Sequence, residues 1–143
     1  MGRRTLIAAA RADGRFDCRV AHWGSDPGRR ADARPLETGL AATAVLAELD
    51  ATYDLLVVTD GRERRYCVCW LDPDLDDVDD VAFARTDDPD TLRDWWTQAK
   101  SRACDARARG VDARTVRASL LAALRRRADA VHVDDASFLR ADR

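Results

Sequence analysis

His22 is the residue of this sequence best suited to acid–base chemistry, because it is one of two histidines and precedes an arginine-bearing loop. The loop contains Arg29, Arg30 and Arg34. A histidine beside arginines would suit a small enzyme acting on a phosphorylated or carboxylated substrate. However, the period-two alternation of the predicted strand continues an apolar row as far as His22. We therefore expect the imidazole to pack inside the protein.

Trp23 extends this region, since it lies at the strand end beside the same loop. A partly exposed indole in such a position is a common anchor of protein interfaces. The predicted binding surface comprises His22, Trp23, Arg29, Arg30 and Arg34. The other tryptophans, Trp70, Trp95 and Trp96, follow apolar rows of a strand and a helix, so we expect them in the core.

The four cysteines are expected to be reduced, buried thiols rather than metal ligands. Cys67 and Cys69 share one face of a predicted strand, but a structural zinc site requires a second pair, which the sequence lacks. A free cysteine without such partners behaves as a small apolar residue. Whether Cys18, Cys67 and Cys69 bind metal stays open at this stage, and we expect no metal and no cofactor.

The acidic segment after residue 71 imitates a calcium loop only in part. Asp72, Asp74 and Asp76 occupy the first, third and fifth positions of such a loop. The glycine position holds Asp77 and the position of the bidentate glutamate holds Phe83, so we expect a solvated loop. The sequence also contains none of the phosphate-binding, dinucleotide-binding or hydrolase motifs. We assign no catalytic residue.

Charge is strongly segregated along the chain although the net charge is only −2. Residues 72–90 contain nine acids and one base, a net charge of −8, whereas residues 98–127 contain nine bases and two acids, a net charge of +7. The predicted basic patch comprises Arg117, Arg125, Arg126 and Arg127. Such a patch could contact nucleic-acid phosphates, but the low net charge and the lack of a nucleic-acid-binding signature favour a protein partner or self-association.

Composition points to a single cytoplasmic domain that spans residues 1–143, with a loose tail at 136–143. A chain of 143 residues with 46% apolar content can bury one core. The apolar run near the N-terminus is shorter than a secretory signal core, and no run approaches the length of a membrane span. The chain has 23 arginines to one lysine and 23 aspartates to three glutamates, which favours a high-GC, salt-adapted source.

The predicted fold is α+β, with a mostly antiparallel sheet of about five or six strands built from two hairpins and about three helices packed on it. Asp13-Gly14 marks the turn between strands 5–11 and 15–23. A second hairpin joins strands 54–59 and 64–71, and strands are also expected at 81–85 and 130–133. Residues 24–35 are expected to form a loop. Helices are expected at 38–49, from Pro89 with Asp88 as cap to Gly110, and after Asp112.

The opening residues MGRRTLIAAARADGRFDCRVAHWG resemble a family of short, uncharacterised haloarchaeal proteins. The matching positions are Gly2, Arg3, Arg4, Gly14, His22, Trp23 and Gly24. The resemblance covers about the first half of the chain and implies a haloarchaeal cytoplasm and a domain of unknown function. It implies no reaction. We expect a non-enzymatic interaction or accessory protein, and a His22 enzyme and a nucleic-acid binder remain as alternatives.

Overall fold

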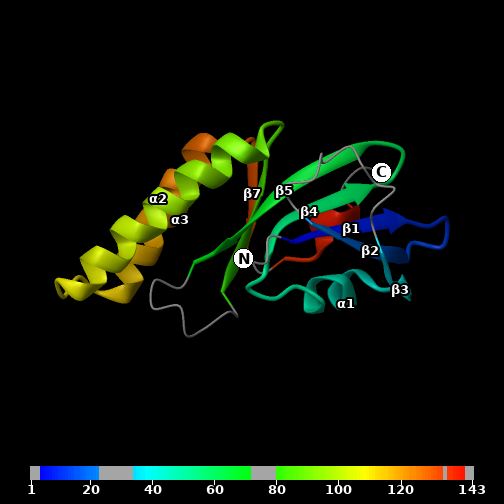
Figure 1. Ribbon diagram of the computed structural model, residues 1–143, viewed down its shortest axis with the longest axis horizontal. Coiled ribbons are helices and arrows are strands. Elements are labelled where there is room, and N and C mark those ends of the chain that lie inside the picture. Colours follow the sequence, from blue (N-terminus) through cyan, green and yellow to red (C-terminus); the bar gives the residue numbers. More distant parts are fainter. Residues whose placement is uncertain (1–3, 23–33, 72–79, 134, 141–143) are drawn as a thin grey trace. The chain divides into compact units, whose positions relative to one another are not determined.

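The computed structural model describes residues 4–22, 34–71, 80–133 and 135–140 as an α+β protein with a mixed seven-stranded sheet (Figure 1). The strand order is β3-β2-β1-β4-β5-β6-β7. The chain divides into two compact units. The first unit contains Met1–Tyr66 and Asp135–Arg143, and the second contains Cys67–Asp134. Strand β5 (Glu63–Trp70) begins in the first unit and ends in the second.

The first unit starts with the predicted hairpin of β1 (Arg4–Ala10) and β2 (Phe16–His22). The two strands are antiparallel and pair in register from Ala10 opposite Phe16 to Arg4 opposite His22. Gly14 lies in the turn with a φ of 82°, a conformation that glycine adopts without strain. The turn chemistry therefore confirms this hairpin.

The segment after the first hairpin departs from the prediction. Residues Arg34–Leu40 form edge strand β3, and the helix α1 is confined to Ala42–Ala47, so the predicted loop to residue 35 and helix from residue 38 were wrong there. Gly39 has a φ of 68°, and its N–H donates to the Asp17 carboxylate at 3.0 Å. Arg15 donates to the Gly39 carbonyl at 2.9 Å. These contacts with the first hairpin hold the chain as a strand against its helical pattern.

Strand β4 (Tyr53–Thr59) pairs with β1 in parallel, so the sheet is mixed, and it has seven strands rather than the expected five or six. The pairs β1–β2, β2–β3 and β6–β7 are antiparallel, as expected. The intervening β2, β3 and α1 bring the chain back to the end of the sheet at which β1 begins, as a parallel pair requires. The predicted burial of β4 on both faces is confirmed, because Leu55, Leu56, Val57 and Val58 are all buried. A short turn at Gly61 then leads into β5.

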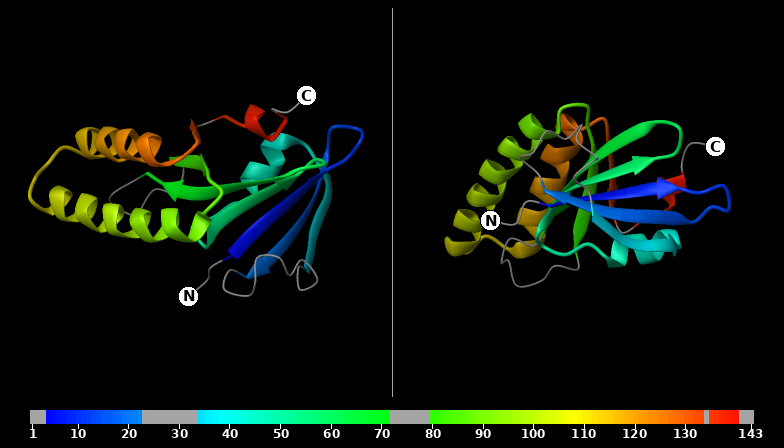
Figure 2. Two further views of the ribbon diagram at one scale, coloured as in Figure 1. Left: turned by 90° about the horizontal axis from the view of Figure 1, so that it is seen from above. Right: turned by 45° about the vertical axis from the view of Figure 1, so that its right-hand side comes forward.

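The second unit consists of the end of β5, β6 (Val81–Arg85), α2 (Pro89–Ala108), α3 (Ala113–Arg127) and β7 (Ala130–Val133). Both predicted caps are confirmed, since Asp88 accepts from the Thr91 N–H and Asp112 accepts from the Thr115 N–H. The long helices run side by side (Figure 2). One core joins the strands to both helices through Cys67, Cys69, Leu71, Ala82, Ala84, Leu92, Trp96, Ala99, Ala103, Val116, Leu120, Leu121 and Leu124.

The end of the described chain forms a short 3₁₀ helix, η2 (Ser137–Arg140), in the first unit. Phe138 and Leu139 are each only 1% exposed, so this turn is anchored by its apolar side chains. It contacts α1, and the Phe138 ring packs on Tyr66 with 4.9 Å between ring centroids. No helix within the described residues is long and apolar enough to cross a membrane.

Candidate binding groove

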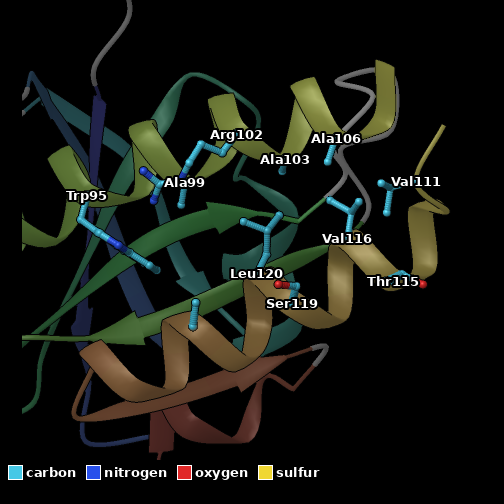
Figure 3. Close-up of a pocket in the computed structure, with 11 residues that line it drawn as sticks. Trp95, Ala99, Arg102, Ala103, Ala106, Val111, Thr115, Val116, Ser119 and Leu120 are labelled. Atoms are coloured by element: carbon cyan, nitrogen blue, oxygen red, sulfur yellow. The ribbon is translucent and has the colours of Figure 1, made fainter. Parts of the chain in front are cut away.

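A groove of about 310 Å³ lies between α2 and α3 in the second unit (Figure 3). Its floor and walls are mostly apolar and mostly small. The described lining residues are Trp95, Ala99, Arg102, Ala103, Ala106, Val111, Thr115, Val116, Ser119, Leu120 and Ala123. The volume is at the lower end of the range typical of ligand sites.

The helices carry this groove because their apolar surface is wider than one core contact needs. Ala103 and Leu120 pack in the core of the second unit and also line the groove, and Arg102 and Ser119, which precede them, line it as well. One step along a helix turns the side chain by about 100°, so the groove extends from the core stripe onto the adjacent stripe of each helix. Alanines on the groove stripes leave space between the helices that larger side chains would fill.

Trp95 closes one end of the groove together with an arginine. The Arg127 guanidinium lies 4.6 Å from the Trp95 ring centroid, which is cation–π geometry. Arg102 lines the groove, and Figure 3 shows its side chain extending along α2 toward Trp95. Trp96 is buried as expected, whereas Trp95 packs against the same core only in part and is half-buried.

Trp70 is also half-buried rather than a full core residue. Its carbonyl accepts a 2.7 Å hydrogen bond from Lys100 of α2, so this lysine joins the helix to the strand within the second unit. Lys100 therefore has a structural contact of its own within the second unit. The basic side chains of residues 98–127 thus make different kinds of contact and do not act as one positive surface.

The helical hairpin as a whole is strongly basic. Residues 89–127 contain ten bases and four acids, a net charge of +6, while the whole chain carries −2. Among the described residues that line the groove, none has a carboxylate, and Arg102 carries the charge. An apolar channel with guanidinium groups at one end is chemically suited to an apolar ligand that carries negative charge.

The arginines of the predicted basic patch do not gather in one place. Arg117 forms a two-pronged ion pair with Asp80, with 2.9 Å between its Nη2 and Asp80 Oδ1. Arg125, Arg126 and Arg127 are exposed and consecutive on α3, so they project in different directions around the helix. Arg126 and Arg127 project on the groove side of α3, and Arg125 projects on the opposite side.

The predicted surface around His22 lies mostly outside the described residues. Trp23, Arg29 and Arg30 lie outside the described residues, and the structure describes only the backbone of His22, at the end of β2 opposite Arg4. Arg34 is exposed at the start of β3, where it pairs in register with Val20. The packing of the His22 ring therefore stays a prediction. The acidic segment that imitates a calcium loop, up to residue 79, likewise lies outside the described part.

The cysteines are placed for packing. Cys18, Cys67 and Cys69 are buried, as predicted, and burial raises the pKa of the Cys18 thiol to about 11. The Cys67 thiol donates to the Pro89 carbonyl at 3.6 Å. In the described parts of the chain, no three His, Cys, Asp or Glu side chains converge as metal ligands would. His132 lies half-buried on β7, opposite Phe83.

A second arginine-based site lies in the first unit and was missed in the sequence. Arg64 of β5 is 2% exposed and donates to the Tyr66 hydroxyl, to the Asp60 carboxylate and to the carbonyls of Phe138 and Leu139, at 2.8 to 3.2 Å. Burial works against its charge, but Tyr66 and Asp60 outweigh burial, so the pKa of Arg64 is raised. This site binds the chain's own C-terminal turn.

Sequence patterns could have indicated both the Arg64 site and the groove. Arg64 stands two residues before Tyr66 in an alternating strand, so it belongs to the same face as a buried aromatic. The helix 89–108 has apolar residues at both Trp95 and Trp96 and again around Ala99 to Ala106, which is broader than one buried stripe.

Comparison of the chain with family models, with curated proteins and with solved structures finds no match.

Proposed function

We propose that this protein is a non-enzymatic interaction domain that binds a helix of a partner protein in the groove between α2 and α3. The observation that carries the proposal is the groove itself, an apolar channel between two helices with an indole and two arginines at one end. Pairs of helices commonly bind a third helix along such a channel.

Two apolar side chains at opposite ends of the groove support this function. Val111, in the turn between the helices, is 38% exposed, and Trp95 is half-buried at the other end. Tryptophan and arginine are the residue types most enriched among interface hot spots. A helix laid along the groove would cover both ends and bury Val111, which otherwise remains in contact with water.

The alternative functions have less support. An enzyme based on His22 would need an orienting carboxylate and an activated nucleophile, and burial of Cys18, Cys67 and Cys69 keeps these thiols away from substrates. Nucleic-acid binding would draw on clustered arginines, but Arg117 is engaged by Asp80 and Arg125 projects away from Arg126. Buried thiols also suit a reducing compartment, which supports the proposed cytoplasmic location.

Site-specific cross-linking tests the proposal. A photoreactive phenylalanine analogue is placed at Ser119, which lines the groove, and separately at Ala118, which is exposed on the same helix and projects away from it. In native cells, Ser119 is expected to cross-link to one defined protein and Ala118 is not. Equal cross-linking from both positions, cross-linking to nucleic acid, or none from Ser119 would overturn the proposal.

A matched pair of bulky substitutions sharpens the test. Ala106→Trp fills the groove from α2, whereas Ala108→Trp adds the same side chain to an exposed position on the far side of that helix. The cross-link from Ser119 should disappear in the Ala106→Trp protein and persist in the Ala108→Trp protein. Thermal unfolding followed by circular dichroism verifies that both variants fold.

A further inference from the structure

We infer that the segment bound by the groove is an acidic amphipathic helix, whose apolar face fills the channel and whose carboxylates pair with Arg102 and Arg127. The inference rests on the proposed function and adds the chemistry of the partner. It is carried by the shape of the floor, the sign of the charge around it, and the contact between Arg127 and Trp95.

The dimensions of the groove fit about three turns of helix. Trp95 and Ala106 mark its length along α2, and eleven residues of helix rise about 16 Å. The floor is formed by buried Ala99, Ala103, Val116 and Leu120. A helix whose apolar residues repeat at i, i+3, i+4, i+7 and i+11 presents a stripe of similar length. Small side chains along the floor let the incoming helix approach closely.

The charge around the groove selects an acidic partner. Arg102 lines the channel, Arg127 lies over Trp95, and Arg126 projects on the same side of α3. All three are exposed. Carboxylates that flank the apolar stripe of the partner helix would meet these guanidinium groups, whereas lysines there would be repelled. No carboxylate among the described lining residues competes for them.

The Trp95 end is already ordered for a carboxylate. Because the ring holds the Arg127 guanidinium at 4.6 Å, the cation is restrained before a ligand arrives, which lowers the entropy lost on binding. A planar guanidinium also presents two parallel N–H groups to a carboxylate. We therefore expect an aspartate or glutamate near one end of the bound helix to be its most sensitive charged residue.

A second copy of this chain and a nucleic acid fit the groove less well. Two helical hairpins that each carry +6 would repel one another if they met face to face. Phosphate contacts require cations but no apolar floor, and the groove is lined mostly by alanine, valine and leucine. Both ligands are kept as outcomes of the experiment below.

The test uses the full-length protein and a designed helical peptide of about 16 residues as probe. The peptide has leucine and alanine at i, i+3, i+4 and i+7 spacing and glutamate at the flanking positions. Three control probes replace glutamate with glutamine, replace glutamate with lysine, or replace the apolar stripe with serine. Isothermal titration calorimetry measures affinity, and ¹⁵N indole signals report on Trp95. The acidic peptide should bind at least about tenfold more tightly than each control.

Matched protein variants locate the contact. Arg127→Gln and Arg102→Gln should each weaken the acidic peptide about fivefold, and Arg125→Gln and Arg114→Gln, on the far side of α3, less than twofold. The inference is wrong if the glutamine peptide binds as well as the acidic one, or if Arg125→Gln weakens binding as much as Arg127→Gln does. It is equally wrong if a short DNA duplex binds more tightly than the acidic peptide or if the unliganded protein dimerises through the groove.

The outcomes separate this inference from the function on which it rests. If the acidic peptide fails but Ser119 still cross-links to a defined protein, the partner chemistry is wrong and the groove remains an interaction site. If the peptide fails and the position-dependent cross-link is also missing, both proposals fall. Because Arg102 and Arg127 are exposed, their glutamine variants should fold, and circular dichroism verifies this.

Discussion

Arg64 in the first unit and Arg127 in the second unit each lie over an aromatic ring, but Arg64 is buried whereas Arg127 is exposed to solvent. The Arg64 guanidinium carbon is 6.0 Å from the Tyr66 ring centroid, and its nitrogens hold the carbonyls of Phe138 and Leu139. The Arg127 guanidinium carbon is 4.6 Å from the Trp95 centroid and is exposed beside an open groove. The first site encloses a segment of its own chain, and the second faces solvent.

The difference shows how one residue type can act in stability or in recognition. A buried arginine contributes when several acceptors satisfy it, and Arg64 has a carboxylate, a hydroxyl and two carbonyls. An exposed arginine over an indole adds little to stability because water competes for it. Its effect becomes large only when a partner excludes that water. Substitutions in the two sites should therefore change different properties.

The largest effect is expected from Phe138→Ala in the first unit. The Phe138 ring is 1% exposed and packs on Tyr66, so its removal leaves a cavity and frees the C-terminal turn. The free energy of unfolding should fall by about 4 kcal/mol. Urea denaturation measures it, and Ser137→Ala, at the exposed neighbouring position, serves as control. Similar losses for both variants would show that the turn is not anchored by this ring.

The next effect is that of Arg64→Met. Methionine keeps the apolar contacts but leaves the Asp60 carboxylate and two carbonyls without their donor, which should cost about 3 kcal/mol of unfolding free energy. Arg65 is the matched control, because it is adjacent and pairs with Glu63 near the surface. Arg65→Met should cost about 0.5 kcal/mol. Neither variant should change binding at the groove.

Turn and helix-cap residues correctly predicted the elements that they start or join. Asp13-Gly14 produced its hairpin, and Asp88 and Asp112 produced their helix starts. The sequence did not predict strand β3, because β3 is a mostly exposed edge strand that contains Pro35 and Gly39. It therefore shows neither apolar alternation nor β propensity. The parallel pairing of β1 with β4 was not predictable either, since it joins segments far apart in the chain.

The candidate site was less predictable than the fold. Sequence patterns showed that residues 98–127 are basic, but not that Arg117 pairs with Asp80 while Arg127 rests on Trp95. Those partners lie 37 and 32 positions away along the chain, so only the packing of α2, α3 and β6 brings them together. Trp95 was predicted to be a core residue because it belongs to the apolar stripe of its helix. The sequence does not show which residues of that stripe stay partly exposed.

Thiol reactivity offers a third measure of how closed the first unit is. At pH 9.0 an ordinary thiol is half ionised, but with its pKa raised to about 11 only about one Cys18 in a hundred is a thiolate. Folded Cys18 should therefore react roughly 50-fold more slowly with iodoacetamide than in urea-unfolded protein. The neutral thiol favours the folded state. This contribution is present below pH 9 and is lost as the pH rises toward about 11.

Peptide mapping of pulse-labelled protein measures this rate for each cysteine separately. Cys104, half-buried on α2, provides the comparison within the second unit and should be labelled before Cys18. If Cys18 were labelled at the same rate in folded and unfolded protein, the first unit would open far more readily than its buried contacts indicate. The unfolding free energy of Cys18→Ala should correspondingly depend less on pH between 9 and 11.

The smallest change in stability is expected from Arg127→Gln, and it separates the two sites most clearly. Loss of an exposed cation–π contact should lower the unfolding free energy by only about 0.5 kcal/mol, measured by urea denaturation. The same substitution should weaken the acidic peptide about fivefold. Arg64→Met should do the reverse, with a large loss of stability and unchanged affinity in the fraction that remains folded. If both substitutions altered stability and binding in proportion, the arginines would not differ in kind. The groove would then be a packing defect between two helices rather than a surface shaped for a partner.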